Sequence, residues 1–173
     1  RAMTTPVAVV TGASSGIGRA LAQQLDAEGY SLVLCDVNEP GLRETQALLK
    51  SGSQRVTLDV SKRAEVEAMA AEVIARHGRI DLVINNAGVS LYGSIAEVTI
   101  EDFEWIFGIN FWGVVYGTKA FLPKMLEQRS GTIVNISSVF GMIAFPNQAP
   151  TTRRSSRCAA SPRRCGSSSR APA

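Results

Sequence analysis

The sequence predicts an α/β fold with a doubly wound parallel sheet, and three observations lead to this prediction. Short apolar runs alternate with stretches of helical periodicity along most of the chain. The runs Val7–Val10, Leu32–Leu34 and Leu82–Ile84 would be apolar on both faces, as in a parallel sheet covered by helices on each side. A glycine-rich turn, Thr11–Gly18, joins the first run to the first helix. Right-handed crossovers between successive strands then make the sheet doubly wound.

The glycine-rich turn is the first feature that points to a ligand. Gly12 lets the chain turn sharply after the strand, and Gly16 removes a side chain where the backbone must approach a pyrophosphate. Gly18 lets the helix, which runs through Leu25, lie close to the strand. The amino-terminal end of this helix presents free N–H groups and a positive dipole end to phosphates. The turn therefore predicts a dinucleotide site, with an ordinary tight βα turn as the alternative.

The second strand of the predicted sheet, Tyr30–Asp36, ends in an acid. Asp36 lies eighteen residues after the last glycine of the turn, where the ribose-binding carboxylate of a dinucleotide-binding fold belongs. We expect the first helix to end near Gly29, and the second helix to run from near Pro40 to near Gly52.

The third strand is predicted over Arg55–Leu58 and is followed by Asp59 and Val60. Ser61 is a good N-cap for a third helix, which Gly78 closes. One face of this helix is apolar, which predicts that it is buried; the face carries Val66, Met69, Ala70, Val73 and Ile74.

Two further strands end in polar motifs. The strand Ile80–Ile84 runs into the motif Asn85–Gly88, and the strand Thr132–Ile136 runs into Ser137–Ser138.

A long helical region is expected between these two strands. The motif Thr99–Asp102 is typical of a capping box and starts this region, which reaches about Gln128. Kinks are expected within it at Gly108, Gly113 and Pro123.

With these motifs in place, the sequence resembles the short-chain dehydrogenase/reductase family. The Thr-Gly-x-x-x-Gly-x-Gly spacing of the turn matches this family's own version of the dinucleotide fingerprint, and the resemblance covers positions 5 to about 150. It implies a Rossmann-like sheet that is incomplete at the C-terminus, because the βα units that normally complete the family's sheet are absent.

The resemblance implies a cofactor, and NAD is favoured over NADP. Asp36 would accept hydrogen bonds from the ribose hydroxyls of the adenosine and would repel a 2′-phosphate. Arg19 could instead meet such a phosphate, but a solvated residue in the first turn of the helix is the favoured interpretation. By resemblance, the residues that cradle the dinucleotide are Gly12, Ser14, Gly16, Ile17 and Gly18. Those that flank the adenine are Asp59 and Val60, and those that line the cofactor beneath the fourth strand are Asn86, Ala87 and Gly88. Asp59 could instead cap a turn before Ser61, which is the less favoured interpretation.

The family's reaction is hydride transfer between the nicotinamide and an alcohol or carbonyl carbon, with Asn, Ser, Tyr and Lys as the catalytic set. By resemblance, Asn110 helps to position a proton-relay water and the Ser138 hydroxyl holds the substrate oxygen. Both have structural alternatives, a buried polar group at a helix kink and a turn residue. The expected positions of the Tyr-x-x-x-Lys pair hold Thr151 and Ser155, which cannot replace a phenol and an ammonium. This chain should therefore be inactive as it stands.

Composition agrees with a globular protein and excludes several other classes. The 173 residues are 45% apolar, and no apolar stretch is long enough to span a membrane. Residues 1–6 lack the apolar core of a signal peptide. The three cysteines suggest neither a disulfide framework nor a metal site, and Cys35 is expected to be a buried, reduced thiol. These features predict a cytoplasmic protein, and the family resemblance implies that it acts on a small-molecule alcohol or ketone.

The chain changes character at Thr151. Residues 151–173 hold six Arg, six Ser and no large apolar residue, so we expect a disordered tail after a dinucleotide-binding domain of residues 1–150. The tail also explains the net charge of +3, because residues 1–150 carry twelve bases against fifteen acids. A GC-rich coding sequence for the family's catalytic helix, read with its first base missing, translates as the fifteen residues Thr151 to Cys165. We therefore expect a shift of reading frame after Pro150.

Two other functions remain open. The chain could be a dinucleotide-binding module without catalysis, or the Arg/Ser tail could bind nucleic acid through its phosphates. The tail lacks aromatic stacking residues and regular repeats, so nucleic-acid binding is disfavoured. A homo-oligomer is expected for an intact family member and is in doubt for this chain.

Overall fold

The structure is a computed structural model that describes residues 5–138. The described residues divide into two compact units. The first comprises residues 5–89 and Phe107–Ile136, and the second comprises Ser90–Ile106 and residues 137–138. The first unit holds the sheet and the candidate site.

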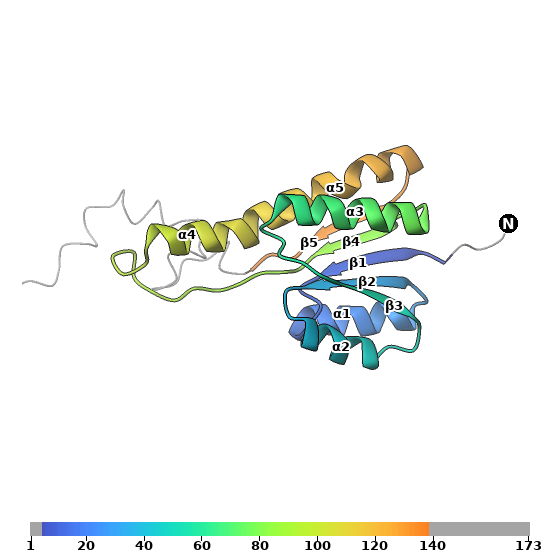
Figure 1. The fold of residues 1–173 in the computed structure, drawn as a ribbon, viewed down its shortest axis with the longest axis horizontal. Coiled ribbons are helices and arrows are strands. Elements are labelled where there is room, and N and C mark those ends of the chain that lie inside the picture. Colours follow the sequence, from blue (N-terminus) through green and yellow to red (C-terminus); the bar gives the residue numbers. More distant parts are fainter. Residues whose placement is uncertain (1–4, 139–173) are drawn as a thin grey trace, which may run out of the picture. The chain divides into compact units, whose positions relative to one another are not determined.

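Within residues 5–138, five parallel strands form one sheet. They are β1 (Val7–Thr11), β2 (Ser31–Asp36), β3 (Ser53–Thr57), β4 (Leu82–Asn85) and β5 (Thr132–Asn135). The order across the sheet is β3-β2-β1-β4-β5, as Figure 1 shows. The direction of winding reverses between β1 and β4, which confirms the doubly wound α/β class. A crevice for a ligand is expected at this switch point.

Helices cover both faces of the sheet. The helices α1 (Gly16–Ala27) and α2 (Glu39–Ala47) lie on one face, and α3 (Arg63–His77) and α5 (Gly113–Gln128) lie on the other (Figure 1). The alternation of side chains along β1 builds both cores, because Ala8 and Val10 pack toward α1 while Val7 and Val9 pack toward α3 and α5. Every residue of β1 is buried, as the apolar run predicts.

The predicted boundaries hold best where a local signal sets them. Helix α1 ends at Ala27 and is followed by Gly29 at a φ of +85°, which confirms the predicted stop. Helix α2 begins at Glu39 but ends at Ala47, short of the predicted Gly52. The reason is tertiary, because the Asp26 carboxylate of α1 accepts hydrogen bonds from the backbone N–H groups of Lys50 and Ser51.

The start of α3 corrects one prediction. The N-cap is Lys62, whose side chain makes no capping hydrogen bond, and not Ser61. Ser61 donates its backbone N–H and its hydroxyl to Asp59 Oδ1, at 2.9 and 2.8 Å. Ser61, predicted to cap the helix, therefore stabilises the turn that precedes it.

The long helical region between β4 and β5 has three parts. Helix α4 (Ile100–Phe107) is followed by the π-helical turn η1 (Gly108–Trp112) and then by α5. The capping box is confirmed, since Thr99 Oγ1 accepts the N–H of Asp102 at 3.2 Å and Asp102 Oδ2 accepts the N–H of Thr99 at 3.0 Å. The predicted irregularity at Gly108 is the π-helical turn, whereas α5 continues through Pro123.

Every helix in the described part of the chain is too short or too polar to cross a bilayer.

Candidate cofactor site

A cavity of about 410 Å³ opens where β1, β2, β3 and β4 end, at the switch point of the sheet. Its walls come from the four segments that follow these strands and from the π-helical turn η1. The lining residues are Gly12, Ser14, Ser15, Gly16, Ile17, Asp36, Val37, Leu58, Asp59, Val60, Asn86, Ala87, Gly88, Val89 and Ile109. All residues predicted for the cofactor site except Gly18 therefore line one cavity.

Two glycines of the turn are required by close contacts. Gly12 has a φ of +68°, and a Cβ there would lie 2.8 Å from Asn86 Nδ2 and 2.9 Å from Ala87 Cα. A Cβ at Gly18 would lie 2.1 Å from the carbonyl oxygen of Gly12. Gly18 thus lets α1 approach the turn itself, rather than the strand as the sequence suggested.

Gly16 has a different role from these two. Its φ is +51°, and a Cβ added there would meet nothing within 4 Å. It begins α1 after the N-cap Ser15, whose side chain makes no capping hydrogen bond. The first N–H groups of α1 therefore have no side-chain acceptor, and they border the cavity beside Gly16. This arrangement is suited to the phosphates of a ligand.

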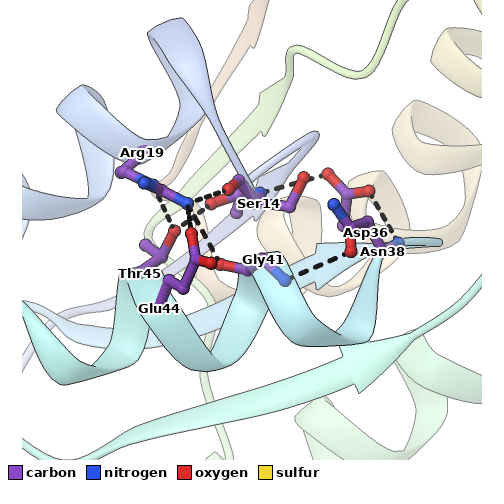
Figure 2. Close-up of polar contacts among 8 residues, drawn as sticks. Ser14, Arg19, Asp36, Asn38, Gly41, Glu44 and Thr45 are labelled. Carbon is purple, nitrogen blue, oxygen red and sulfur yellow. Dashed lines mark hydrogen bonds and ion pairs between the residues drawn. The ribbon is translucent and has the colours of Figure 1, made fainter.

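Asp36 is fixed at the end of β2 by two backbone donors. Its Oδ2 accepts the N–H of Ser14 at 3.1 Å and its Oδ1 accepts the N–H of Asn38 at 3.0 Å, as Figure 2 shows. Each carboxylate oxygen has a further lone pair, so the group can also accept hydrogen bonds from a ribose diol. The residues present at this cavity therefore fit an adenosine ribose beside a pyrophosphate.

Cys35 precedes this aspartate and is shielded by burial. Burial, with the charge of Asp36 as a smaller cause, raises the pKa of the Cys35 thiol to about 12. The thiol therefore stays protonated, which agrees with the expected buried, reduced cysteine and excludes it as a nucleophile near neutral pH.

Thr11 ties the motif after β4 to the glycine-rich turn. Its Oγ1 accepts the N–H groups of Asn86 at 3.0 Å and Ala87 at 3.1 Å, and it donates to the carbonyl of Ile84 at 3.3 Å. Asn86 Nδ2 donates to the carbonyls of Thr11 and Gly12 at 3.0 and 3.3 Å. The sequence indicated the Asn-Asn-Ala-Gly motif but not this use of Thr11, because its partners lie more than seventy residues away.

Asp59 and Val60 take the places expected for them at the cavity. Asp59 lines the cavity and also caps the turn at Ser61, so the cap does not keep this residue from the cavity. Val60 is buried, and a Cβ at Gly113 would lie 2.9 Å from its Cγ2. This contact explains why a glycine begins α5.

Asn110 lies in η1 and forms a reciprocal pair with Val89. Its Nδ2 donates to the carbonyl of Val89 at 2.8 Å, and its Oδ1 accepts the N–H of Val89 at 2.9 Å. The amide therefore holds the segment after Gly88 against the π-helical turn.

A comparison with known families decides what kind of protein has this cavity. The family model described as short chain dehydrogenase matches residues 6–151. The chain belongs to the short-chain dehydrogenase family. The match starts just before β1, covers the whole sheet and stops at Thr151, the residue at which the composition changes.

Individual proteins similar to this chain agree with this assignment. SadH of Mycobacterium tuberculosis is 47% identical over 146 residues, which cover 83% of this chain and 53% of SadH. A family member from Burkholderia phymatum, solved in complex with NAD, superposes with a TM-score of 0.80 at 39% identity and covers 85% of this chain and 54% of its own. A metagenomic family member in complex with NADP gives 0.79 at 32% identity, over 85% and 69% of the two chains. This chain spans about half the length of the curated relatives it matches.

The residues that the family resemblance assigns to catalysis fall in three places. Asn110 lies in the first compact unit, next to the cavity-lining residue Ile109. Ser138 is exposed and belongs to the second unit. Thr151 and Ser155, which occupy the positions of the Tyr-x-x-x-Lys pair, lie outside the described residues, as does the whole predicted tail.

Proposed function

We propose that this chain carries the cofactor half of an oxidoreductase that transfers a hydride between NAD(H) and the alcohol or carbonyl carbon of a small molecule. The observation that carries the proposal is the Asp36 carboxylate, held by two backbone donors at the wall of the same cavity as the glycine-rich turn. NAD would supply the hydride acceptor; the Asp36 carboxylate would hold its adenosine ribose, and the backbone N–H groups at the start of α1 would hold its pyrophosphate.

The preference for NAD over NADP rests on charge. The solved relatives include one in complex with NAD and one in complex with NADP, so the family alone gives no preference. A negative carboxylate at position 36 favours two ribose hydroxyls and disfavours a 2′-phosphate. Arg19 offers little compensation, because its guanidinium is paired with Glu44 at 2.9 Å.

Asn110 and Ser138 are the two catalytic residues that we assign to this chain. The side-chain amide of Asn110 is bonded to the backbone of Val89, which fixes the π-helical turn. Asn110 would therefore help to position a proton-relay water by holding this turn in place. The Ser138 hydroxyl would hold the substrate oxygen. A group that exchanges a proton with this oxygen needs a pKa lowered toward neutrality, and neither Thr151 nor Ser155 provides one.

The missing pair is explained best by a shift of reading frame after Pro150, with residues 151–173 as the out-of-frame product. The family match stops at residue 151, which supports this. A coding sequence that can be written for the family's catalytic helix, read with its first base missing, also translates as Thr151 to Cys165. The coding DNA around Pro150 tests the frame directly.

The function is tested with three versions of the chain: this chain, the double variant Thr151→Tyr with Ser155→Lys, and the chain with the frame restored by one inserted base. We expect NAD-linked turnover of secondary alcohols only in the frame-restored chain, because the Arg/Ser segment cannot pack as a helix around two substituted residues. Activity of this chain that is lost on Ser138→Ala would contradict our account of the site.

The same measurements separate the two other functions. NAD binding without turnover, even with the frame restored, would favour a dinucleotide-binding module without catalysis. Nucleic-acid binding that weakens steeply with salt and disappears on deletion of residues 151–173 would favour the tail as a binding arm. The family match ends at the first residue of the tail, so we keep the oxidoreductase as the proposal.

A further inference from the structure

Arg19 is a charged residue of the first unit that does not line the cofactor cavity, yet it is bonded directly to the turn that does. Its Nε donates to Thr45 Oγ1 at 2.9 Å, and its Nη2 pairs with Glu44 Oε2 at 2.9 Å. The same Nη2 donates to the carbonyl oxygens of Ser14 and, more weakly at 3.4 Å, Gly41. Figure 2 shows the guanidinium reaching from α1 to both the turn and α2. Both interpretations made from the sequence, a phosphate ligand and a solvated residue, miss this arrangement.

With the bond from Arg19, both polar groups of the Ser14 backbone have hydrogen-bond partners. The N–H of Ser14 donates to Asp36 Oδ2 at 3.1 Å, while its carbonyl accepts from Arg19. Ser14 immediately precedes the N-cap Ser15 and the left-handed Gly16. The orientation of the Ser14 backbone therefore sets the direction of the N–H groups that begin α1.

Helix α2 supports the turn from the same side as Arg19. Thr45 is fully buried, and its hydroxyl accepts from Arg19 and donates to the carbonyl of Ala13 at 2.8 Å. Gly41 lies so close to the turn that an added Cβ would be 2.8 Å from Ser14 Cβ and 3.0 Å from Ser14 O. The turn thus packs directly against the first turns of α2, with Arg19 bonded to both.

We propose that Arg19 is a positioning residue for the pyrophosphate-binding turn, acting through Ser14 and braced by Thr45 and Glu44 of α2. It does not contact the phosphates itself; it fixes the backbone that donates to them. This inference rests on the proposed dinucleotide site and extends it to a residue outside the cavity. It predicts that removal of the guanidinium weakens ligands that carry a pyrophosphate and spares a ligand that lacks one.

The test is isothermal titration of the full chain with NAD, ADP and adenosine. For Arg19→Gln we expect the dissociation constants of NAD and ADP to rise about tenfold, as for the loss of a charged hydrogen bond, with adenosine changed less than about twofold. Arg19→Lys keeps the charge but not the planar fork, so an intermediate loss is expected. Arg63→Gln removes a guanidinium from an exposed ion pair with Glu67 on α3 and serves as the matched control, without effect on any of the three ligands.

A second pair of variants tests the same idea without touching the arginine. Gly41→Ala pushes a methyl group against Ser14 and should also weaken ADP but spare adenosine, whereas Gly52→Ala enters open space and should change neither. Unchanged ADP affinity in both Arg19→Gln and Gly41→Ala would overturn the inference, as would an equal loss for ADP and adenosine, which would indicate a general loss of structure. If the unsubstituted chain binds none of the three ligands, the proposed dinucleotide site itself is wrong.

Discussion

Strands β1 and β5 belong to one parallel sheet but have contrasting surroundings. All five residues of β1 are buried, and the turn that follows it is held by Thr11, Asp36 and Arg19. In β5 only Ile133 is half-buried, and the other three residues are exposed. The exposed fraction of the apolar side chain is 36% for Val134 and 40% for Ile136, just beyond the strand. The difference teaches that, among residues 5–138, the centre of the sheet is packed on both faces, whereas β5 exposes apolar side chains.

The largest effect that would sharpen this contrast is expected at Gly18. The Cβ of Gly18→Ala would lie 2.1 Å from the backbone oxygen of Gly12, so the turn and α1 must separate. We expect NAD binding to be lost and the free energy of unfolding to fall by about 3 kcal/mol. Calorimetric titration and urea unfolding measure the two effects. The control Gly52→Ala enters open space, and NAD affinity unchanged in Gly18→Ala would contradict the close packing described for the turn.

A second prediction concerns the charge at the end of β2. Asp36→Asn keeps an acceptor for Ser14 but removes the charge, so the ratio of the NADP to the NAD dissociation constant should fall by about tenfold. Fluorescence titration of both dinucleotides measures this ratio. Glu67→Gln, which removes an exposed acid from α3, should leave it unchanged. A ratio that does not move would show that the carboxylate plays no part in the choice of cofactor.

A third prediction concerns Asp81, at the opposite end of the sheet from the cavity. Burial alone would raise the pKa of this carboxyl, but hydrogen bonds from Arg79 and from the N–H of Val7 outweigh burial and lower it. A lowered pKa stabilises the fold above the unfolded pKa of Asp, and the stabilisation is lost as the pH falls through the folded value. We expect Asp81→Asn to lower the free energy of unfolding by about 1 kcal/mol at pH 7.

Urea unfolding of Asp81→Asn and the unsubstituted chain from pH 7 to pH 3 measures this difference. The two curves should converge at the acidic end. A difference that persists unchanged to pH 3 would mean that packing of the side chain, rather than its charge, is responsible.

The smallest effect is expected at the exposed edge of the sheet. Val134→Thr replaces a methyl group by a hydroxyl on an exposed strand, so the free energy of unfolding should change by less than about 0.5 kcal/mol. The binding of an apolar dye should decrease. In the matched variant Val83→Thr, the hydroxyl enters the buried core of β4, and a loss of about 2 kcal/mol is expected. Equal losses at the two positions would remove the contrast between the centre and the edge.

Sequence reasoning worked where a residue type and its immediate neighbours determine the structure. Gly12 makes the sharp turn expected of it, with a φ of +68°, and Asp36 ends its strand at the cavity as the spacing suggested. Reasoning from the sequence failed where the deciding partner is distant along the chain. Ser61 is a local exception, because its acceptor Asp59 lies only two residues away and the turn that forms is the one offered from the sequence as the less favoured alternative. No pattern around Arg19 indicates that its guanidinium donates to Thr45, 26 residues away, and to the carbonyl of Ser14.

The buried thiol of Cys35 can report transient opening of the sheet around β2. Cys35 lies in β2, hydrogen-bonded between β1 and β3, where burial raises its pKa to about 12. An alkylating reagent can therefore modify it only in moments when β2 separates from its neighbours. The rate of alkylation of the Cys35 peptide, measured by mass spectrometry, would report how often β2 separates from its neighbours. A dinucleotide bound beside Asp36 should lower this alkylation rate in proportion to the fraction of sites that it occupies.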